Sequence, residues 1–409
     1  MRKKIAAAVV VGAFVSAVLP GAPPASAAAA AAAGAGVRAD FNGDGVSDLA
    51  IGVPDEDSAV PDSGAVNVIY GSAANGLRAA GNQLWTQDSP GIRDTAEAYD
   101  GFGHAVAAGD FNGDGYSDLA VGVPFEIIGA NRELGEGAVN VIYGSAAGLT
   151  AAGNQFWSQD SPGVGDVAEA DDQFGFSLAV GNLGGSAHDD LAIGVPAEDP
   201  HNGGPTLYDT GAVNVIYGTA TGLKGSAQNP VWTQDSPGIA ETAELHDQFG
   251  LVLAIGNFGR SNYDDLAVGV PEEATGPEGV HVIYGAASGL SSSGSQYWSQ
   301  NSAGIADAAE DGDRFGRSLA AGDLGRSAYD DLAIGAPSET LAATLQGAVH
   351  VIYGTPTGLA AAGSQFWSQD SPGIAVAGEY TDQFGWALTI GDFGRSAHED
   401  LAVGVPNET

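Results

Sequence analysis

Short apolar runs recur along the chain, and turn-forming residues bound each of them. Between residues 102 and 159 they cover 102–109, 119–123, 138–143 and 155–159. These runs are rich in β-branched and aromatic residues and are bounded by Gly, Pro, Asn or Asp, which is typical of β-strands. Since no helical periodicity interrupts them, the pattern predicts an all-β chain.

The strand pattern belongs to a longer repeat. Residues 40–54 read DFNGDGVSDLAIGVP, and residues 110–124 repeat them almost unchanged. Four altered copies follow, so that the loop that opens the motif starts at residues 40, 110, 182, 257, 323 and 392. A spacing of 66–75 residues indicates a repeat architecture. Four short antiparallel strands in each repeat, arranged around a circle, form a β-propeller.

We therefore predict a β-propeller over residues 37–409. Its six units start near residues 37, 102, 174, 249, 315 and 384. The sixth unit shows only the first two strand signals, which leaves open a truncated chain, an open ring or closure by a partner chain. A calcium-bound parallel β-helix does not fit, because its repeat is only about nine residues long.

A Trp recurs in the fourth strand of five units. We expect these rings to pack between neighbouring blades rather than to stack on a sugar. The five residues are Trp85, Trp157, Trp232, Trp298 and Trp367.

The N-terminus has the features of an export signal. Residues 2–4 are basic, residues 5–19 form an uncharged and mostly apolar run, and residues 25–27 read Ala-Ser-Ala. We predict a signal peptide over residues 1–27, cleaved after about Ala27, and an Ala/Gly-rich disordered tail over residues 28–36. The apolar run is short for a membrane span, so we expect a secreted protein without membrane insertion.

The charge of the chain restricts its partners. It has 13 Lys and Arg against 51 Asp and Glu, which gives a formal net charge of −38. Such a surface repels nucleic acid and anionic membranes and attracts cations or basic partners. The chain has no Cys, so core packing and bound metal are the expected sources of stability in an exported protein.

Two of the repeated loops have the donor pattern of a calcium site. Oxygen-bearing side chains occupy positions 1, 3, 5 and 9 of each loop, and position 7 supplies a backbone carbonyl. Hard oxygen ligands at alternate positions of a loop that turns at glycines suit Ca²⁺. We expect two strong calcium sites, formed by Asp40, Asn42, Asp44, Val46, Asp48, Asp110, Asn112, Asp114, Tyr116 and Asp118.

The other four loops have too few carboxylates for a strong calcium site. In these weak or lost metal loops positions 1 and 9 are Asn182 and Asp190, Asn257 and Asp265, Asp323 and Asp331, and Asp392 and Asp400. Position 4 is arginine in three of them, as Arg260, Arg326 and Arg395. We hypothesise that a guanidinium and additional backbone hydrogen bonds replace the metal there. The alternative is that these arginines are simply solvated.

The loops on the opposite face repeat a different acidic pattern. A Glu follows every Gly-x-Pro by two residues, and Glu-x-x-Asp recurs before each Phe-Gly. Their regularity favours a role in bracing neighbouring blades, whereas the longer segments 124–137 and 196–211 break the symmetry and are where we expect specific binding. The possible ligand face comprises Glu56, Phe125, Glu126, Arg132, Glu198, His201, Tyr208, Glu273 and Glu339.

Phe-Gly, an Asp-rich loop and Asp-Leu-Ala-x-Gly-x-Pro follow one another in five units. This pattern resembles the FG-GAP repeats of the integrin alpha-subunit N-terminal propeller, over essentially the whole mature chain. The resemblance implies a propeller fold, calcium in the loop between strands one and two, and ligand binding on the opposite face. Members of that family mostly have seven repeats, and this chain has fewer. The Phe-Gly pairs begin at Phe102, Phe174, Phe249, Phe315 and Phe384.

Three functions fit the sequence. The first is a non-catalytic binding or adhesion module for an unknown protein or matrix ligand. The second is a secreted hydrolase of a polymer or phosphodiester, with a carboxylate-lined site on the acidic face, since FG-GAP repeats also occur beside the catalytic domain of glycosylphosphatidylinositol-specific phospholipase D. The third is a structural surface protein that closes with another chain. The sequence has no recognisable nucleophile or catalytic motif, so we predict no catalytic residue, and whether the protein is an enzyme stays open at this point.

Overall fold

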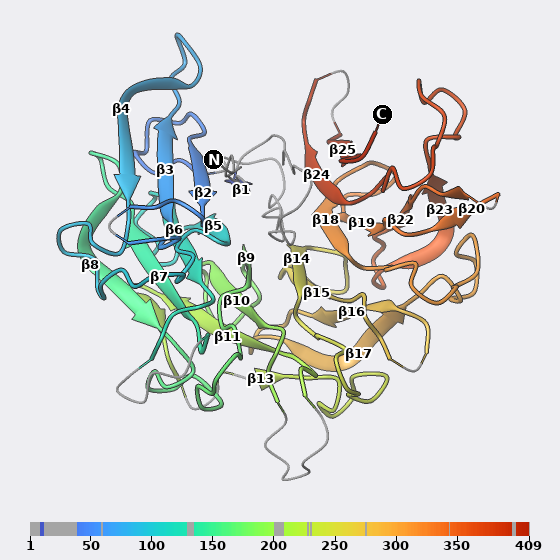
Figure 1. The fold of residues 1–409 in the computed structure, drawn as a ribbon, viewed down its shortest axis with the longest axis horizontal. Coiled ribbons are helices and arrows are strands. Elements are labelled where there is room, and N and C mark those ends of the chain that lie inside the picture. Colours follow the sequence, from blue (N-terminus) through green and yellow to red (C-terminus); the bar gives the residue numbers. More distant parts are fainter. Residues whose placement is uncertain are drawn as a thin grey trace.

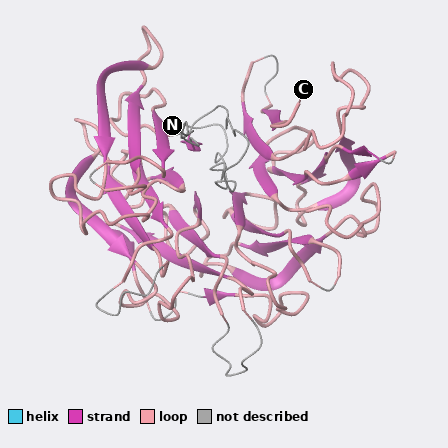
Figure 2. Ribbon diagram, in the orientation of Figure 1, coloured by secondary structure: helices cyan, strands magenta, loops and turns pink. Residues whose placement is uncertain are grey.

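All regular structure in the described part of the protein is β (Figure 2). The structure is a computed structural model that describes residues 9–11, 39–58, 60–128, 135–199, 208–226, 229, 231–274, 276–342, 344–394 and 398–408. Within these residues there is no helix that could span a membrane.

Each repeat folds into an antiparallel sheet. The first two sheets contain β2 (Leu49–Val53), β3 (Ala65–Tyr70) and β4 (Arg78–Trp85), then β5 (Val106–Gly109), β6 (Asp118–Val123), β7 (Ala138–Tyr143) and β8 (Thr150–Trp157). The third contains β9 (Ser177–Gly181), β10 (Asp190–Val195), β11 (Ala212–Thr219), β12 (Gly222–Lys224) and β13 (Val231–Trp232). The fourth contains β14 (Val252–Gly256), β15 (Asp265–Val270), β16 (Gly279–Tyr284) and β17 (Ser291–Trp298).

The last two repeats continue the series. The fifth sheet contains β18 (Ser318–Gly322), β19 (Asp331–Ala336), β22 (Ala348–Tyr353) and β23 (Ala360–Trp367). Between β19 and β22 lies a small hairpin of β20 (Thr340–Leu341) and β21 (Thr344–Leu345). The sixth sheet has the two strands that the sequence predicts, β24 (Ala387–Gly391) and β25 (Asp400–Gly404).

The sheets follow one another around a common centre, as in a propeller (Figure 1). Their first strands contact one another in order, β5 with β9, β9 with β14, β14 with β18 and β18 with β24. Among the described strands the first and last sheets do not pair with each other. The predicted all-β fold of FG-GAP-type propeller blades is confirmed.

The first sheet has an additional strand from the predicted signal peptide. Strand β1 (Val9–Val11) pairs antiparallel with β2, in the place that the first strand holds in the other complete sheets. The predicted disordered tail, residues 28–36, lies outside the described residues.

Two strand boundaries of the second unit differ from the prediction. The first strand begins at Val106 and not at Phe102, because Phe102 bridges to Gly64 of the preceding unit and its amide donates to the Ser63 carbonyl at 3.0 Å. The Phe-Gly motif therefore joins two sheets instead of opening one. The fourth strand begins earlier, at Thr150, and ends at Trp157.

The hydrophobic core is divided among the seams between successive sheets. In the first seam Val66 and Val68 of β3 belong to the same buried cluster as Leu119 and Val121 of β6. Burial of such side chains contributes about 1.5–3 kcal/mol each, so apolar packing holds the sheets together. Trp85, Trp157, Trp232 and Trp298 belong to these buried clusters, which supports the predicted structural role of the tryptophans.

A tyrosine at the end of the third strand also links neighbouring units. The Tyr70 hydroxyl donates to Gln83 Oε1 at 2.5 Å and accepts from the amide of Leu149, in the next unit, at 3.0 Å. Gly148 has φ +91° and permits this approach, since a Cβ there would overlap the Tyr70 hydroxyl. The same tyrosine-to-leucine link recurs from Tyr217 to Leu290 and from Tyr284 to Leu359.

Candidate functional site

The loops gather on two rims with different chemistry. We call the rim with the loops that start at residues 40, 110, 182, 257, 323 and 392 the metal-loop rim. The other rim contains the loops after each Gly-x-Pro and the crossing loops that lead from one sheet to the next, and we call it the acidic rim. Antiparallel connection of four strands places these two sets of loops at opposite ends of the sheet.

In the first metal loop the oxygen-bearing side chains hold the backbone in a tight turn. The two oxygens of Asp40 accept from the amides of Asp44 at 3.1 Å and Gly45 at 2.8 Å. Asn42 Oδ1 also accepts from Asp44 N, at 2.9 Å. The second loop repeats these contacts with Asp110, Asn112 and Asp114.

The aspartate at position 9 has a structural role in every loop type. Asp118 is buried, and its two oxygens accept from the amides of Phe111 at 3.0 Å and Gly144 at 2.9 Å. Burial raises the pKa of Asp118 to about 8, and the nearby carboxylates of Asp110 and Asp114 raise it further in the same direction. The same pair of hydrogen bonds recurs at Asp48, Asp190, Asp265 and Asp331.

The donor set of the first two loops fits a hard cation. Asp40, Asn42 and Asp44 offer oxygen acceptors in a partly exposed loop, and the backbone carbonyl of Val46 completes the alternate spacing. The second loop offers the same set, with side-chain oxygens from Asp110, Asn112 and Asp114 and the backbone carbonyl of Tyr116. Asp48 and Asp118 already hold two backbone amides each, so their main part at such a site is to fix the loop geometry. The two calcium sites remain a prediction.

The later loops replace oxygen donors with a cationic side chain. The Arg260 guanidinium lies 4.1 Å from the centre of the Tyr284 ring, and its Nε donates to the carbonyl of Thr357 in the next unit at 2.9 Å. Arg326 lies 4.1 Å from the centre of the Tyr353 ring. These contacts show that Arg260 and Arg326 are packed and not simply solvated, and the replacement of the metal by arginine stays a prediction. Arg395 lies outside the described residues.

First-position side chains still turn the later loops. Each accepts a hydrogen bond from the amide two residues further on, at 2.7–3.1 Å. The four residues are Asn182, Asn257, Asp323 and Asp392. Asp400 at position 9 of the last loop accepts from Phe393 N at 3.1 Å.

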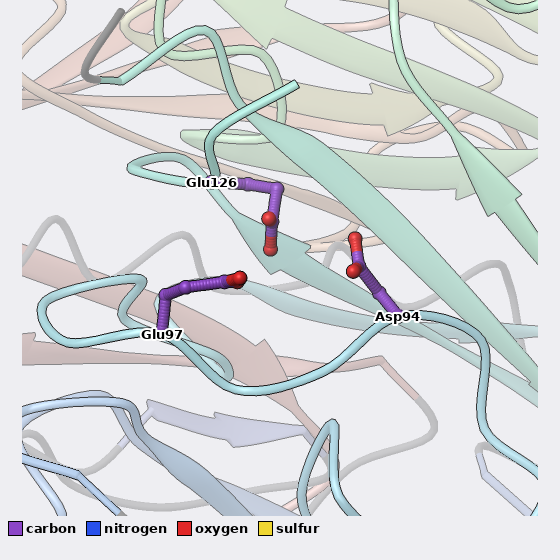
Figure 3. A group of neighbouring side chains, drawn as sticks. All are labelled: Asp94, Glu97 and Glu126. Atoms are coloured by element: carbon purple, nitrogen blue, oxygen red, sulfur yellow. The ribbon is translucent and has the colours of Figure 1, made fainter. Parts of the chain in front are cut away.

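On the acidic rim the structure brings carboxylates into groups of three. In each group one oxygen of every residue lies within 4.8 Å of the others, a spacing that could hold a metal ion. Figure 3 shows the first group, in which the carboxylates of Asp94, Glu97 and Glu126 point toward one another. The four groups are Asp94, Glu97 and Glu126; Glu169, Asp172 and Glu198; Glu244, Asp247 and Glu273; and Asp307, Glu310 and Glu339.

Each group joins two units through a glutamine. Gln87, which follows β4, donates from Nε2 to Glu126 at 2.5 Å, and Glu126 belongs to the next unit. The pair recurs with the same separation of 39 residues, as Gln159 with Glu198, Gln234 with Glu273, Gln300 with Glu339 and Gln369 with Glu408. The predicted bracing role of these glutamates is thus visible as hydrogen bonds across each seam.

The pKa values of the glutamates that pair with these glutamines are strongly raised. Burial raises the pKa of Glu126 to about 9, and the neighbouring carboxylates of Asp100 and Asp94 contribute in the same direction. Burial and the carboxylates of Asp313 and Asp307 raise the pKa of Glu339 to about 8. The pKa of Glu198 and that of Glu273 are raised for the same reasons.

The residues of the predicted ligand face divide by exposure. Glu126, Glu198, Glu273 and Glu339 are buried beneath the rim, and Glu56 is exposed. Phe125 and Tyr208 are exposed by 39% and 55%. Arg132 and His201 lie outside the described residues.

Exposed apolar side chains concentrate on the acidic rim. Of the eleven large apolar side chains that are exposed in the described part of the chain, eight lie in its loops. The eight are Tyr99, Phe125, Val167, Tyr208, Leu245, Ile374, Val376 and Tyr380. Sequence reasoning singled out only two of them, because the crossing loops look regular and polar in sequence.

Comparison with known proteins supports the repeat assignment. The family model of the FG-GAP repeat matches residues 32–69 and 102–140. Integrin alpha-PS2 of Drosophila melanogaster is 30% identical over 263 residues, which is 63% of this chain and 16% of the integrin. Integrin alpha ina-1 of Caenorhabditis elegans is 29% identical over 278 residues, 64% of this chain and 23% of the integrin.

Similarity extends beyond integrins. Phosphatidylinositol-glycan-specific phospholipase D of Bos taurus is 34% identical over 162 residues, 39% of this chain and 18% of the phospholipase. The matches thus span less than a quarter of the length of each of these relatives. The repeated strands, the Phe-Gly bridges and these matches together identify the chain as an integrin alpha-like FG-GAP repeat protein.

Proposed function

We propose that this protein is a secreted, calcium-binding and non-catalytic binding module of the adhesion type, which contacts its ligand with the acidic rim. The observation that carries the proposal is the concentration of exposed apolar side chains there. Exposed apolar groups that gather on one surface within a polar surround are typical of interaction sites.

One part of this surface lies where the first and second units meet. Tyr99 is 65% exposed in the crossing loop, and Phe125 is 39% exposed in the loop after β6. The Phe125 amide is held by the Asp100 carbonyl at 3.4 Å, and its ring lies 6.0 Å from that of the buried His104. Aromatic side chains on a fixed backbone bind with little loss of conformational entropy.

The charge of the protein favours a basic ligand. The net charge of −38 repels nucleic acid and anionic membranes. The relatives named as integrins support a protein or matrix ligand as the class of partner. A partner chain that adds strands to the series of sheets is the second type of contact we propose to test, by sedimentation at several concentrations.

A binding assay with matched variants tests the ligand surface. Immobilised extracellular matrix proteins are the probes, and we expect Tyr99→Ser with Phe125→Ser to reduce retention of the protein at least tenfold. Leu77→Ser is the control, since Leu77 is 50% exposed in the hairpin between β3 and β4, at the opposite end of the sheet. Equal binding of both variants would remove the acidic rim as the ligand surface.

Calcium and export are tested on the same preparation. We propose two calcium ions in loops 40–48 and 110–118, which titration calorimetry of single loop variants counts directly. Cleavage after about Ala27 predicts that the exported protein starts at Ala28, which N-terminal sequencing checks.

Hydrolysis at the acidic rim is the second candidate. It is favoured by the raised pKa of Glu126, a property of carboxylates that act as general acids. Phosphodiester and polysaccharide substrates, tested with wild type and Glu126→Gln, decide between the two functions. Turnover that the variant loses would establish the enzyme and overturn the non-catalytic proposal.

A further inference from the structure

The four carboxylate groups of the acidic rim occupy equivalent places. In the first, Asp94 and Glu97 come from the crossing loop between β4 and β5, and Glu126 comes from the loop after β6 (Figure 3). The fourth has the same construction, with Asp307, Glu310 and Glu339. Each group therefore sits where a chain crossing meets the body of the next unit.

The spacing of the oxygens already suits an ion. Within each group the three ligand oxygens lie within 4.8 Å of one another. Calcium binds oxygens at about 2.3–2.6 Å, so two ligands on opposite sides of one ion lie up to about 5 Å apart. An ion could enter each group without movement of the backbone.

A buried oxygen without a donor provides the second observation. Glu339 is fully buried, its Oε2 accepts from Gln300, and its Oε1 has no hydrogen-bond partner among the described residues. The carboxylate that holds this unpartnered atom also contributes a ligand oxygen to the group formed with Asp307 and Glu310. A buried polar atom that lacks a partner costs about 1–3 kcal/mol.

A further carboxylate with an unpartnered oxygen, Asp100, lies next to the first group. Asp100 is fully buried beside it; its Oδ2 accepts from Glu97 N at 2.6 Å, and its Oδ1 has no partner in the described structure. Glu126 faces three carboxylates, those of Asp100, Asp94 and Glu97, and accepts from the side-chain amide of Gln87 and from the amide of Ile127 at 3.2 Å. This environment supplies negative charge and acceptors, and a cation would balance both.

We propose that each of these four groups binds one divalent cation, calcium being the best match to an all-oxygen donor set, and that the ion fixes the crossing loop to the following unit. The sites differ in residues and in position from loops 40–48 and 110–118, and they do not depend on the proposed ligand surface. The competing occupant is a proton shared between carboxylates, which would satisfy the same oxygens without metal.

The decisive experiment counts ions on the full chain in which the two metal loops are disabled. Asp44→Asn and Asp114→Asn remove one carboxylate from each loop. Equilibrium dialysis of this double variant with calcium at pH 7.5 is expected to retain four ions per chain. Zero retained ions would overturn the proposal and leave the shared proton. Retention of all six ions would support the four rim sites and show that the loop substitutions did not release calcium from the loops.

A matched pair of surface substitutions assigns the ions to the groups. Asp307 and Asp311 are both exposed in the same crossing loop, but only Asp307 belongs to a group. In the loop-disabled background Asp307→Asn is expected to lose one of the four ions, or to weaken one site at least tenfold, and Asp311→Asn to lose none. Equal ion counts for the two variants would overturn the proposal.

Terbium luminescence gives an independent readout. Trp298 precedes Gln300, the partner of Glu339, by two residues and can sensitise a lanthanide in the fourth group. In the loop-disabled background Trp298→Phe and Glu339→Gln are expected to remove the same portion of the emission. Unchanged emission in a folded Glu339→Gln variant, verified by circular dichroism, would contradict the assignment.

Discussion

The second unit (residues 102–173) and the fourth unit (residues 249–314) share one backbone framework and differ in the chemistry placed on it. Asp118 and Asp265 make the same two buried hydrogen bonds to backbone amides. At position 4 of the loop the backbone is left-handed in both, with φ +71° at Gly113 and +70° at Arg260. The framework therefore tolerates a side chain at a position that favours glycine.

The difference lies in where positive charge comes from. The loop of the second unit has three carboxylates and one amide at its ligand positions, and we propose that a calcium ion from solvent balances them. The loop of the fourth unit has its own cation, whose guanidinium stacks on Tyr284 and reaches Thr357. Charge balance can thus be solved by a bound ion or by an arginine on the same turn.

The third strands differ as well. Asn140 of β7 donates to the Arg93 carbonyl at 3.1 Å, whereas the equivalent residue of β16 is His281, packed against Phe249 and Tyr297. The fifth unit repeats the exchange with His350. His281 and His350 should therefore add sensitivity to acid in the fourth and fifth units beyond that of His104 in the second unit, whose pKa burial lowers to about 4. Sensitivity to calcium should belong to the loops of the first two units.

The largest expected effect is loss of stability in acid through these histidines. Burial lowers the pKa of His281 to about 3 and that of His350 to about 4, from 6.5. Below pH 6.5 the unfolded chain takes up protons that the folded chain does not, so stability present above pH 6.5 is lost as pH falls toward 4. We expect about 3 kcal/mol per histidine at pH 4, or about 6 for both.

The measurement compares denaturant unfolding of the wild type and of His281→Asn with His350→Asn between pH 4 and 7. The double variant, which places the Asn of the second unit at both positions, should lack the loss due to these two histidines and keep the loss due to His104. His246→Asn is the control, because the His246 side chain is 59% exposed beside Asp209. If the difference in free energy of unfolding between wild type and double variant did not change with pH, these two histidines would not be the source of acid sensitivity.

Calcium removal is the next largest effect. At a free calcium concentration of 100 Kd each occupied loop contributes about 2.7 kcal/mol, so the two loops contribute about 5 kcal/mol. Asp44→Asn with Asp114→Asn should remove this increment, as measured by unfolding with calcium and with chelator. Ser261→Ala with Ser327→Ala, at the same position of the arginine loops, should leave the increment intact. If both double variants lost the calcium-dependent increment in stability, the arginine loops would also bind calcium and the comparison would fail.

Substitution of the aspartate at position 9 should affect both units alike. Asp118→Ala and Asp265→Ala each leave two buried amides without an acceptor, at about 1–3 kcal/mol per amide. We expect a loss of about 2–6 kcal/mol in each, measured from denaturant midpoints with unchanged slopes. A loss confined to Asp118→Ala would mean that the shared framework is not what holds the arginine loops.

The smallest expected effect is the difference in stability between two substitutions of Arg260, which distinguishes its side-chain contacts from the strain of its left-handed backbone. Arg260→Ala loses the contact with the Tyr284 ring and the bond to Thr357, and we expect it to cost about 1–2 kcal/mol. Arg260→Gly loses the same contacts but relieves the left-handed backbone, so it should be about 1 kcal/mol more stable than the alanine variant. Thermal unfolding of the two variants measures the difference, and the reverse order would show that the backbone there is unstrained.

Sequence alone predicted most strands and missed the contacts at the seams. Leu119–Val123 is an apolar run between Asp and Pro, and such runs fix strands locally. The sequence pattern predicts Phe102 in a strand. Its bridge to Gly64 depends on how two sheets meet, which the local pattern does not contain. The amide-holding role of Asp118 was hidden by its place in a metal motif, although the persistence of Asp at position 9 in all six loops was a signal.

The carboxylate groups were out of reach for a related reason. Their members come from two units, and only the folded seam brings Asp94 and Glu97 to Glu126. The regular Trp-x-Gln at the end of the fourth strand, such as Trp85 with Gln87, was the available signal. Only the structure shows that Gln87 Nε2 lies within hydrogen-bond distance of Glu126, 39 residues later.

The seams have a mechanical consequence. Each of the first seams is closed near one rim by a tyrosine, such as Tyr70 with Leu149, and near the other by a glutamine, such as Gln87 with Glu126. A seam held at both ends resists rotation about either end, so a tensile load is carried by both bonds and the apolar surface together. Extension under force should therefore proceed in steps, with one unit released at a time.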